Sequence, residues 1–595
     1  MAIIDKTYYS GTDQYSDGDT EEENLLRIVR EGKRLSDLPE QDVTWPVFYH
    51  LSPFRENICS WFPFEPGARV LEIGAGCGAV TGALCGKGLK ITSVDLSLRR
   101  TQINYERHKD CDDLVLMVGN LNEISFSEQF DYILLIGVLE YAGRFTERES
   151  PYKQFLVNIR KLLKPEGKLL LAIENRMGLK YFAGAPEDHL GIPFSGLKGY
   201  NEETGIRTFS KSELTRLLET SGFKGHRFYY PYPDYKFPQE IFTDETLISQ
   251  HYGKPYMIFD RERVEVFPEF KVASVLAEDG AAGALSNSFL VEASINELPG
   301  EELQVYYAKL NSGRKEEFRI GTILCGNHGL SSVIKYAQDK AAETHIRNLS
   351  DNETVLSRFH PILNGKLDEK RIIYPFCGYS TLEDILQEAV RNNDPDCIKR
   401  VFKIIRELSV TSAREESYDS EAFTHWFGTE RTGNPVMFCT KPANVDMAPD
   451  NIFTEGDSFI LFDCEWVTNF QVPVSFIVWR SVENTYLRIP EIEKILSKEM
   501  LVKELGIYSE DIPVFKAWSW HFENHYVTWQ SNTPFAKEIC PAMYSPAEAE
   551  KRLRQLTQSE QSLKEEIEWI HHTWSWRLTR GFRVIYRFLT GKGRK

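Results

Sequence analysis

Short apolar runs alternate with helical segments through the first half of the chain. Five apolar runs have the length and composition of strands, at 69–73, 90–95, 114–119, 132–137 and 168–174. The segments 78–86, 99–108 and 152–163 have helical composition. Strands that alternate with helices along a chain form a parallel sheet with helices on both faces. The pattern therefore predicts a doubly wound α/β domain over residues 65–255.

A different order of elements follows residue 264. Strand-like runs come first, at 271–276, 288–293, 304–310, 317–324 and 332–336, and helical patterns follow at 340–349 and 397–408. Strands followed by helices indicate an α+β unit with a sheet lobe and a helical lobe. We assign residues 264–540 to this bilobal unit, and we interpret the Tyr- and Pro-rich stretch 229–238 as the boundary loop.

The two ends of the chain differ in character from the middle. Residues 1–64 read as a polar leader followed by helical segments, and 545–595 as a helix that ends in a basic amphipathic tail. Residues 569–595 combine aromatic and apolar side chains with seven Lys or Arg and no acid. This combination is typical of an interfacial helix on an anionic membrane. The alternative is docking onto an acidic protein surface, of this chain or of a partner.

Composition narrows the classes of function. The 595 residues include 70 Lys or Arg and 87 Asp or Glu, a net charge of −17, which argues against nucleic acid as a partner. The ten cysteines form no CxxC pair, which argues against structural zinc and a disulfide scaffold and fits a reducing cytoplasm. No run approaches the roughly 18 apolar residues of a membrane span. We expect a cytoplasmic protein, peripherally associated with the inner face of the cytoplasmic membrane.

A glycine-rich turn follows the first predicted strand. The sequence VLEIGAGCG places Gly74, Gly76 and Gly78 directly after the strand. Glycines let the backbone turn tightly and expose bare amides to a ligand. Asp95 ends the next strand, where a carboxylate can bind a ribose diol. The arrangement predicts a nucleotide site, and both NAD and S-adenosylmethionine fit it.

Further motifs distinguish these two cofactors. VLEIGAGCG, FDYILLIGVLEY and LLKPEGKLLLAIEN occur in the order found in class I S-adenosylmethionine-dependent methyltransferases, which this part of the chain resembles. The resemblance implies a Rossmann-like fold with S-adenosylmethionine as cofactor. It also implies the roles of six residues: Gly74, Gly76 and Gly78 in the cradle, Glu72 behind the methionine moiety, Asp95 at the ribose, and Asn120 where many members carry Asp near adenine. The alternative is a Rossmann unit that binds another nucleotide.

The loop after the fifth predicted strand is the expected site of the methyl acceptor. It is dense in glycine and aromatic residues and contains Glu187, Asp188 and His189. His189 is our candidate general base, or a group that positions an anion. The alternative is a solvated histidine in a turn. A phosphate acceptor is already ionised, so the cations Arg176, Lys180 and Lys198 would then matter more than a base.

A second set of chemical groups lies at 446–463. Asp446 is followed by Asn451 five positions later and by Asp463 after a hairpin. Phosphoryl transfer needs a carboxylate to orient the hydroxyl, and an amide and a carboxylate to hold Mg²⁺. The segment resembles the protein-kinase-like superfamily, especially its choline and aminoglycoside kinase branches. The resemblance implies ATP as substrate, Asp446 as the catalytic residue, and Asn451 and Asp463 as Mg²⁺ ligands.

The sequence departs from the kinase family at two positions, and two lysines compete for one role. Asn444 stands where the family usually has His, and Cys464-Glu465 stands where protein kinases have Phe-Gly, which argues against a protein substrate. Three residues are candidates for ATP binding: Lys335 as the phosphate lysine, Glu343 as its helix partner, and Lys309 as the competing lysine. The alternative is a kinase-like unit without activity.

The order of the two units resembles bacterial O-antigen chain-terminating kinase–methyltransferases. The resemblance implies a bifunctional enzyme that phosphorylates and methylates a cell-surface polysaccharide or its lipid-linked precursor. It implies a glycan or lipid-linked glycan as acceptor and a glycosyltransferase as a partner. The alternative is a methyltransferase with a non-catalytic, kinase-like binding scaffold.

Overall fold

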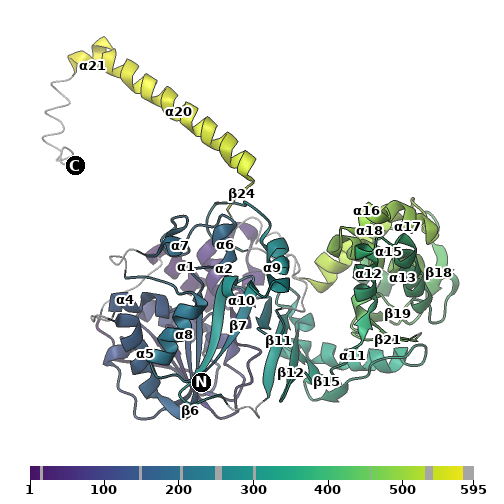
Figure 1. Cartoon of the computed structure of the whole chain (residues 1–595), viewed down its shortest axis with the longest axis horizontal. Helices are drawn as coiled ribbons and strands as arrows, with labels where there is room; N and C mark the ends of the chain where they lie inside the picture. Colours follow the sequence, from purple (N-terminus) through teal and green to yellow (C-terminus); the bar gives the residue numbers. More distant parts are fainter. Residues whose placement is uncertain are drawn as a thin grey trace.

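The structure is a computed structural model that describes residues 1–11, 13, 18–145, 150–200, 205–247, 258–298, 303–456, 458–528 and 541–579. Figure 1 shows two bodies joined through strands, with one long helix leading away from both. We call residues up to 298 the first domain and residues 303–528 the second unit.

A single fourteen-stranded sheet runs through both bodies, in the order β1-β4-β3-β2-β5-β6-β10-β7-β8-β11-β12-β13-β15-β14. Its first-domain strands are β1 (Ile3–Tyr8), β2 (Arg69–Ile73), β3 (Lys90–Asp95), β4 (Leu114–Gly119), β5 (Phe130–Ile136), β6 (Leu163–Glu174), β7 (Gly225–Tyr232), β8 (Glu240–Thr243) and β10 (Ser288–Ser294). Its second-unit strands are β11 (Gln304–Leu310), β12 (Ile320–Gly326), β13 (Ser332–Ala337), β14 (Lys366–Asp368) and β15 (Arg371–Pro375).

The predicted parallel sheet is confirmed. β2 lies between β3 and β5 and is parallel to both, and β6 extends the parallel block. Helices α3 (Leu98–His108) and α5 (Pro151–Leu162) occupy two of the three predicted helical segments. The third prediction, a helix over 78–86, is wrong, because only a 3₁₀ turn forms there (Thr81–Ala83). The segment contains three glycines, each of which lowers helix stability by roughly 1 kcal/mol relative to alanine.

The predicted boundary between the two units differs from the structure. β10, which we assigned to the second unit, lies between β6 and β7 and is antiparallel to both. Phe289, Leu290 and Val291 are fully buried there. Part of the proposed boundary loop is strand β7, and the predicted strand 271–276 lies in helix α9 (Glu269–Glu278). An apolar run indicates that a strand is buried, but not which strands it pairs with. The pairing of β10 with β6, more than 100 residues earlier in the chain, could therefore not be predicted.

The N-terminal residues belong to the first domain. β1 pairs in parallel with β4 at the edge of the sheet, so residues 3–8 are not a leader. The predicted helical segments are present as α1 (Asp19–Arg30), α2 (Trp45–Leu51) and the 3₁₀ helix η3 (Pro53–Ile58). α1 is tied to α3 by a buried ion pair between Glu22 and Arg100 (3.0 Å). Residues of α2 and η3 lie at the carboxyl ends of the central strands, beside Gly74 and Asp95.

The second unit has the predicted order of a sheet followed by helices. Helix α11 (Glu343–Leu356) packs against the sheet, and α12 (Leu382–Arg391), α13 (Pro395–Leu408), α15 (Val474–Arg488) and α18 (Ile512–His521) form a separate helical body. A large aromatic core, which includes Phe423, Phe427 and Trp518, fills this body. The sheet is shared, because Tyr307 of β11 pairs with Phe242 of β8.

The C-terminal helix leaves the body of the molecule. α20 (Pro546–His572) extends away from both units (Figure 1), and its Leu553, Leu556, Leu563 and Ile567 are exposed. A short helix, α21 (Trp574–Leu578), follows, and residues 580–595 of the predicted basic tail lie outside the described residues. In the part of the chain that the structure describes, no helix has both the length and the apolar character needed to cross a membrane.

The cysteines differ from the prediction in one respect. Cys85 and Cys111 form a disulfide with a Cα–Cα distance of 5.7 Å, while seven other described cysteines are free. The pair joins the turn after the 3₁₀ helix η4 (Thr81–Ala83) to the loop that precedes β4. Because the fold brings together two positions 26 residues apart, no local spacing motif marks them.

Candidate functional site

The glycine-rich turn forms a cradle at the carboxyl end of β2. Gly74, Gly76 and Gly78 all have positive φ angles, of 72°, 54° and 76°. A Cβ on Gly74 would lie 2.6 Å from Val138, and one on Gly78 would lie 2.3 Å from Asn104. Side chains are therefore excluded from this turn by backbone conformation, and at two positions also by close packing.

Asp95 holds the cradle from the adjacent strand. Its two carboxylate oxygens accept hydrogen bonds from the backbone N–H groups of Gly76 (2.8 Å) and Ser97 (2.9 Å). Burial raises the pKa of Asp95, while Arg100 opposes that shift. Asp95, which we predict to bind the ribose, therefore also fixes the conformation of the glycine-rich loop.

Glu72 lies below the cradle and is 3% exposed. It accepts hydrogen bonds from the hydroxyls of Ser93 (2.6 Å) and Thr81 (2.7 Å), and burial raises its pKa to about 7.

Asn120 accepts a hydrogen bond from the Asn122 N–H and so begins the turn after β4.

A cavity of about 290 Å³ opens above these residues. Glu72, Gly74, Gly76, Asp95 and Asn120 all line it, as the sequence predicted. Gly78 does not line this cavity, because its bare Cα leaves room for Asn104 of α3 instead. The site residues that sequence reasoning missed come from the N-terminal segment and from the turn after β5, and they include Tyr49, His50, Arg55, Gly137 and Tyr141.

A second cavity of about 400 Å³ adjoins the first. The two share Tyr49, His50, Gly137 and Tyr141 as lining residues. The second cavity is lined by charged groups from distant segments: Glu140, Lys180, Asp188, His189, Asp234, Lys236, Arg261 and Arg263. The expected acceptor residue His189 therefore lies beside the cofactor cavity and not inside it.

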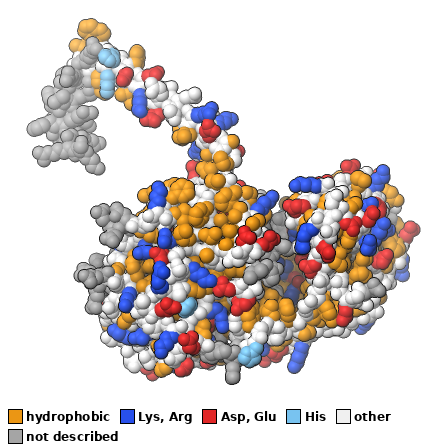
Figure 2. Space-filling view, viewed as in Figure 1, with side chains coloured by type: hydrophobic (Ala, Val, Ile, Leu, Met, Phe, Trp, Pro, Cys, Tyr) orange, Lys and Arg blue, Asp and Glu red, His pale blue; other side chains and the backbone are white. Residues whose placement is uncertain are grey.

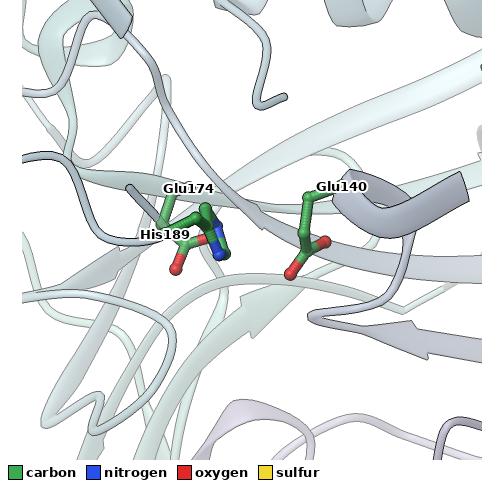
Figure 3. A group of neighbouring side chains, drawn as sticks. All are labelled: Glu140, Glu174 and His189. Carbon is green, nitrogen blue, oxygen red and sulfur yellow. The ribbon is translucent and has the colours of Figure 1, made fainter. Parts of the chain in front are cut away.

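Three side chains converge beside the second cavity: Glu140 and His189 line it, and Glu174 is fully buried behind them. One carboxylate oxygen each of Glu140 and Glu174 and one ring nitrogen of His189 lie within 4.8 Å of one another. Figure 3 shows the Glu140 carboxylate on one side of the gap and the paired Glu174 and His189 on the other. Glu174 ends β6, and Glu140 lies in the 3₁₀ turn η6 (Leu139–Tyr141) after β5.

The charges of this cluster are strongly coupled. Burial disfavours the imidazolium form, but Glu174 raises the pKa of His189 to about 9. Burial also opposes ionisation of Glu174, but Lys236 and His189 hold its pKa well below the ordinary value. Burial, reinforced by Glu174, raises the pKa of Glu140 to about 8. His189 is therefore protonated near pH 7 in this arrangement and is not ready to accept a proton, so the general-base role does not follow from the geometry.

The other predicted cations are only partly brought to this cavity. Lys180 lies in the network, with Asp188 at 2.8 Å and Asp234 at 3.3 Å. Arg176 is instead paired with Glu213 (2.6 Å). Lys198 ends the short helix α7 (Ser195–Lys198) and does not line either cavity. Acids at the ends of β5 and β6 could have indicated Glu140 and Glu174, whereas no sequence signal marked Lys236.

The second unit brings together the residues of the other motif. Lys335 of β13 forms an ion pair with Asp463, although 128 positions separate them. Asn451 donates its side-chain N–H to the carbonyl of Asp446 (3.3 Å), and the Phe462 N–H donates to the carbonyl of Asn451 (3.1 Å). The charge of Asp463 also helps to raise the pKa of Asp446, after burial, which is the main cause. The four predicted residues therefore form one polar cluster.

The two other predicted nucleotide-binding residues have different positions. Glu343 forms ion pairs with Lys370 (2.8 Å) and Arg347 (3.7 Å), and the predicted pair with Lys335 does not occur among the described contacts. Helix α11 turns Glu353 toward the cluster instead, where burial raises its pKa and Lys335 opposes that rise. Lys309 is exposed and lies two strands from Lys335 on the same face, since both pair with Thr322 of β12.

Buried contacts brace the Asp463 loop from behind. Glu465 binds His345 of α11 (2.7 Å) and Arg314, and Asn352 of α11 donates to the carbonyl of Cys464 (3.1 Å). Burial opposes the charge on Glu465, but Arg314 and His345 hold its pKa down to about 2. Asp463 itself has a positive φ of 56°, an uncommon backbone conformation that is often found at functional sites. The Asn444 side chain accepts from the Asp446 N–H (3.1 Å), a structural use for the residue that replaces the family's His.

Comparison with known proteins identifies the first domain. The sequence model of a methyltransferase domain family matches residues 49–227. A malonyl-[acyl-carrier protein] O-methyltransferase from Priestia megaterium is 34% identical over 163 residues, which are 26% of this chain and 54% of that protein. A demethylmenaquinone methyltransferase from Tropheryma whipplei is 29% identical over 119 residues, 20% of this chain and 46% of that protein. The chain thus spans about half the length of these two relatives.

Among solved structures, a phosphoethanolamine N-methyltransferase 2 from Haemonchus contortus matches with a TM-score of 0.27 and 16% identity, over 47% of this chain and 58% of that one. The strand order over this part of the chain is β4-β3-β2-β5-β6-β10-β7, in which β10 is antiparallel to both of its neighbours. The family match and these relatives support a class I, S-adenosylmethionine-dependent methyltransferase domain that includes residues 49–227.

Proposed function

We propose that the chain transfers a methyl group from S-adenosylmethionine to an oxygen atom of an acceptor in the second cavity. The acceptor oxygen forms a bond to the methyl carbon, the sulfur–methyl bond breaks with its electron pair left on sulfur, and any proton on the oxygen passes to solvent. One observation carries the proposal: the cofactor cradle and the charged cavity meet at Gly137 and Tyr141. An acceptor in the second cavity is therefore next to a cofactor in the first.

We favour a phosphorylated glycan as the acceptor. A phosphate oxygen is already ionised, so it needs no base, and His189 is protonated near neutral pH in the described arrangement. The lysines and arginines of the second cavity suit a ligand that carries negative charge and many hydroxyl groups. A sugar hydroxyl is the alternative acceptor, and it would require a proton acceptor that the described groups supply less readily.

We further propose that the second unit phosphorylates a small molecule or glycan with ATP and Mg²⁺. Asn451 and Asp463 offer amide and carboxylate oxygens, the ligand type that Mg²⁺ prefers, and Lys335 is positioned to bind phosphate. Asp446 would orient the attacking hydroxyl. The support is the meeting of these four residues from segments more than 100 positions apart. In the alternative function, the second unit only binds the glycan.

Asp446→Asn tests the order of the two reactions. The variant should lose phosphotransfer, because the hydroxyl loses its orienting carboxylate, while binding of S-adenosylmethionine is retained. Methylation of the bare glycan should disappear with it. Supplying a chemically phosphorylated acceptor should restore methylation in the same variant. Full methylation of the bare glycan by this variant would instead show a hydroxyl acceptor and independent activities.

We also propose that the chain works at an anionic membrane surface, in company with a glycosyltransferase, on a lipid-linked polysaccharide. The basic tail is one support, and an apolar surface is another. Figure 2 shows hydrophobic side chains gathered on the first domain near the start of α20. Val275 of α9 and Met543 of β24 (Met543–Tyr544) are exposed on the elements there. Deletion of residues 573–595 should move the protein from membrane to soluble fractions, and unchanged fractionation would contradict the proposal.

A further inference from the structure

The cluster of Glu140, Glu174 and His189 has the arrangement of an incomplete metal site. Each residue offers one ligand atom, and these atoms face one another within 4.8 Å. The donors come from three separate segments that end at the same edge of the sheet: η6, β6 and the loop after α6 (Leu179–Phe182). In a site with metal–ligand bonds of about 2.1 Å, tetrahedral ligand atoms lie roughly 3.4 Å apart. A contraction of up to about 1.4 Å in these separations would therefore close three ligands around an ion.

Outer contacts hold two of the side chains so that the remaining atoms face inward. Oε1 of Glu174 is bound by Lys236 (2.6 Å) and by the Tyr235 hydroxyl (3.3 Å), and Oε2 faces Nε2 of His189 (3.3 Å). Nδ1 of His189 lies 3.2 Å from the Tyr141 hydroxyl. Metal-binding histidines are commonly oriented in this way, with the other ring nitrogen hydrogen-bonded to a fixed group.

Glu140 supplies the independent observation that a ligand is missing. Its side chain is 1% exposed, and its Oε2 has no hydrogen-bond partner among the described residues. Figure 3 shows its carboxylate across a gap from Glu174 and His189. A buried carboxyl oxygen without a hydrogen-bond partner is unfavourable, so a group that pairs with it is expected.

The charge of the surrounding network has the matching sign. Four carboxylates, those of Glu140, Glu174, Asp188 and Asp234, face two ammonium groups. Lys236 binds Glu174 and Asp188, and Lys180 binds Asp188 and Asp234. Two further cations of this cavity, Arg261 and Arg263, are balanced by Asp260 and Glu269. Without a metal ion, the protons on Glu140 and His189 balance this network. Once both protons are released, as metal binding requires, two carboxylate charges remain, and one divalent cation would neutralise them.

We propose that Glu140, Glu174 and His189 bind one divalent transition-metal ion, such as Zn²⁺ or Mn²⁺, in the wall of the second cavity. One imidazole with two carboxylates favours these ions over Ca²⁺, which takes oxygen ligands. Three protein ligands leave a position open to the cavity. Binding requires the neutral form of His189, so the metal ion competes with a proton for the ring nitrogen.

The open position gives the ion a role in the proposed methyl transfer, and this role rests on that proposed function. An acceptor oxygen that binds the ion is fixed next to the cofactor cavity, and a hydroxyl bound to the ion loses its proton more easily. Metal binding itself does not depend on methyl transfer.

Metal binding is measured on the full-length chain in the background of Asp463→Asn, which removes the other expected cation site. The probes are Mn²⁺ and Zn²⁺ alone, in equilibrium dialysis followed by elemental analysis. We expect about one equivalent of metal in this background. Adding Glu140→Gln or His189→Ala should weaken the affinity by at least about tenfold. Glu213→Gln is the matched control, since it removes an equally charged acid outside the cluster.

Two further measurements make the result decisive. Pulsed electron paramagnetic resonance of bound Mn²⁺ should show coupling to an imidazole nitrogen that disappears with His189→Ala. Calorimetry with S-adenosylmethionine checks that each variant keeps its fold and its cofactor site. Absence of bound metal in the Asp463→Asn background, or equal binding after Glu140→Gln, would overturn the proposal. Metal binding without S-adenosylmethionine binding would retain the metal site and refute the proposed methyl transfer.

Discussion

The cofactor cradle and the polar cluster of the second unit are built in opposite ways. The cradle is made largely of backbone, since three glycines and the carboxylate of Asp95 fall within 22 residues, and all of these except Gly78 line an open cavity. The cluster in the second unit is made of side chains, and its two oppositely charged members, Lys335 and Asp463, already neutralise each other. The first site needs only a ligand of the correct shape. The second must exchange an internal ion pair for contacts with its ligand.

This difference sets how each site responds to substitution. In the cradle, loss of the Asp95 side chain would change the loop conformation and remove the expected ligand contact together. In the second unit, helix α11 and the Asp463 loop are joined through His345, Asn352 and Glu465, so a change at one position is transmitted through packed neighbours.

The largest expected effect is at Asp95. Asp95→Ala removes two charge-assisted hydrogen bonds to the backbone of Gly76 and Ser97 together with the ribose contact. Losses of about 3 kcal/mol correspond to roughly 100-fold weaker binding of S-adenosylmethionine by calorimetry. Asp131→Ala is the matched control, because Asp131 also accepts two hydrogen bonds, from the Arg69 N–H and from Lys164, but at the other end of the sheet. Equal affinities in the two variants would contradict the assignment of the cradle.

The contrast also explains how much could be predicted from sequence. The residues of the cradle are close in the chain and follow predicted strands, so their local pattern determined both their type and their position. The place of β10 depends on pairing with β6 and β7, which no local pattern encodes. Lys236 binds Glu174 only because a loop more than 60 residues away folds over the sheet. Long-range contacts of this kind account for most of what the sequence did not show.

The periodicity of helix α11 distinguishes Glu343 from Glu353. Both lie on α11, and ten residues at 100° per residue turn the helix to a different face. Ile346 and Leu349 are buried at positions that share a stripe with Glu353, whereas Glu343 lies outside that stripe. An acid inside an apolar stripe is the residue that faces the interior, so helical periodicity would have selected Glu353.

A smaller effect is expected from substitution of these two glutamates, and it tests the polar cluster of the second unit. Glu353→Gln removes a buried negative charge near Lys335 and should reduce phosphotransfer by about tenfold, or 1.4 kcal/mol. Glu343→Gln changes the same residue type on the same helix but affects only ion pairs with the exposed side chains of Lys370 and Arg347, so its effect should stay within twofold. Steady-state kinetics with ATP separates the two. Because Glu353 also accepts a hydrogen bond from the Tyr374 hydroxyl, thermal unfolding must be recorded for both variants. A larger loss in Glu343→Gln would restore the original assignment.

The smallest expected effect is at Glu56, which lies at the junction of the first domain and the second unit. Glu56 of η3 lies near Arg107 of the first domain and near Arg319 and Asp339 of the second unit, and burial raises its pKa to about 7. Between pH 4.5 and 7 the folded protein holds this proton more tightly than the unfolded chain does. Glu56 therefore contributes stability below pH 4.5 that is lost as the pH rises through 7. Because water partly reaches the junction, we expect a loss on the order of 1 kcal/mol between pH 5 and 8. Urea unfolding should show that Glu56→Gln flattens this slope, and that Asp339→Asn, which removes a charge that raises the pKa of Glu56, flattens it in part. If both variants keep the wild-type slope, the two bodies do not share a buried charge at their junction, and the cradle and the cluster respond to pH independently.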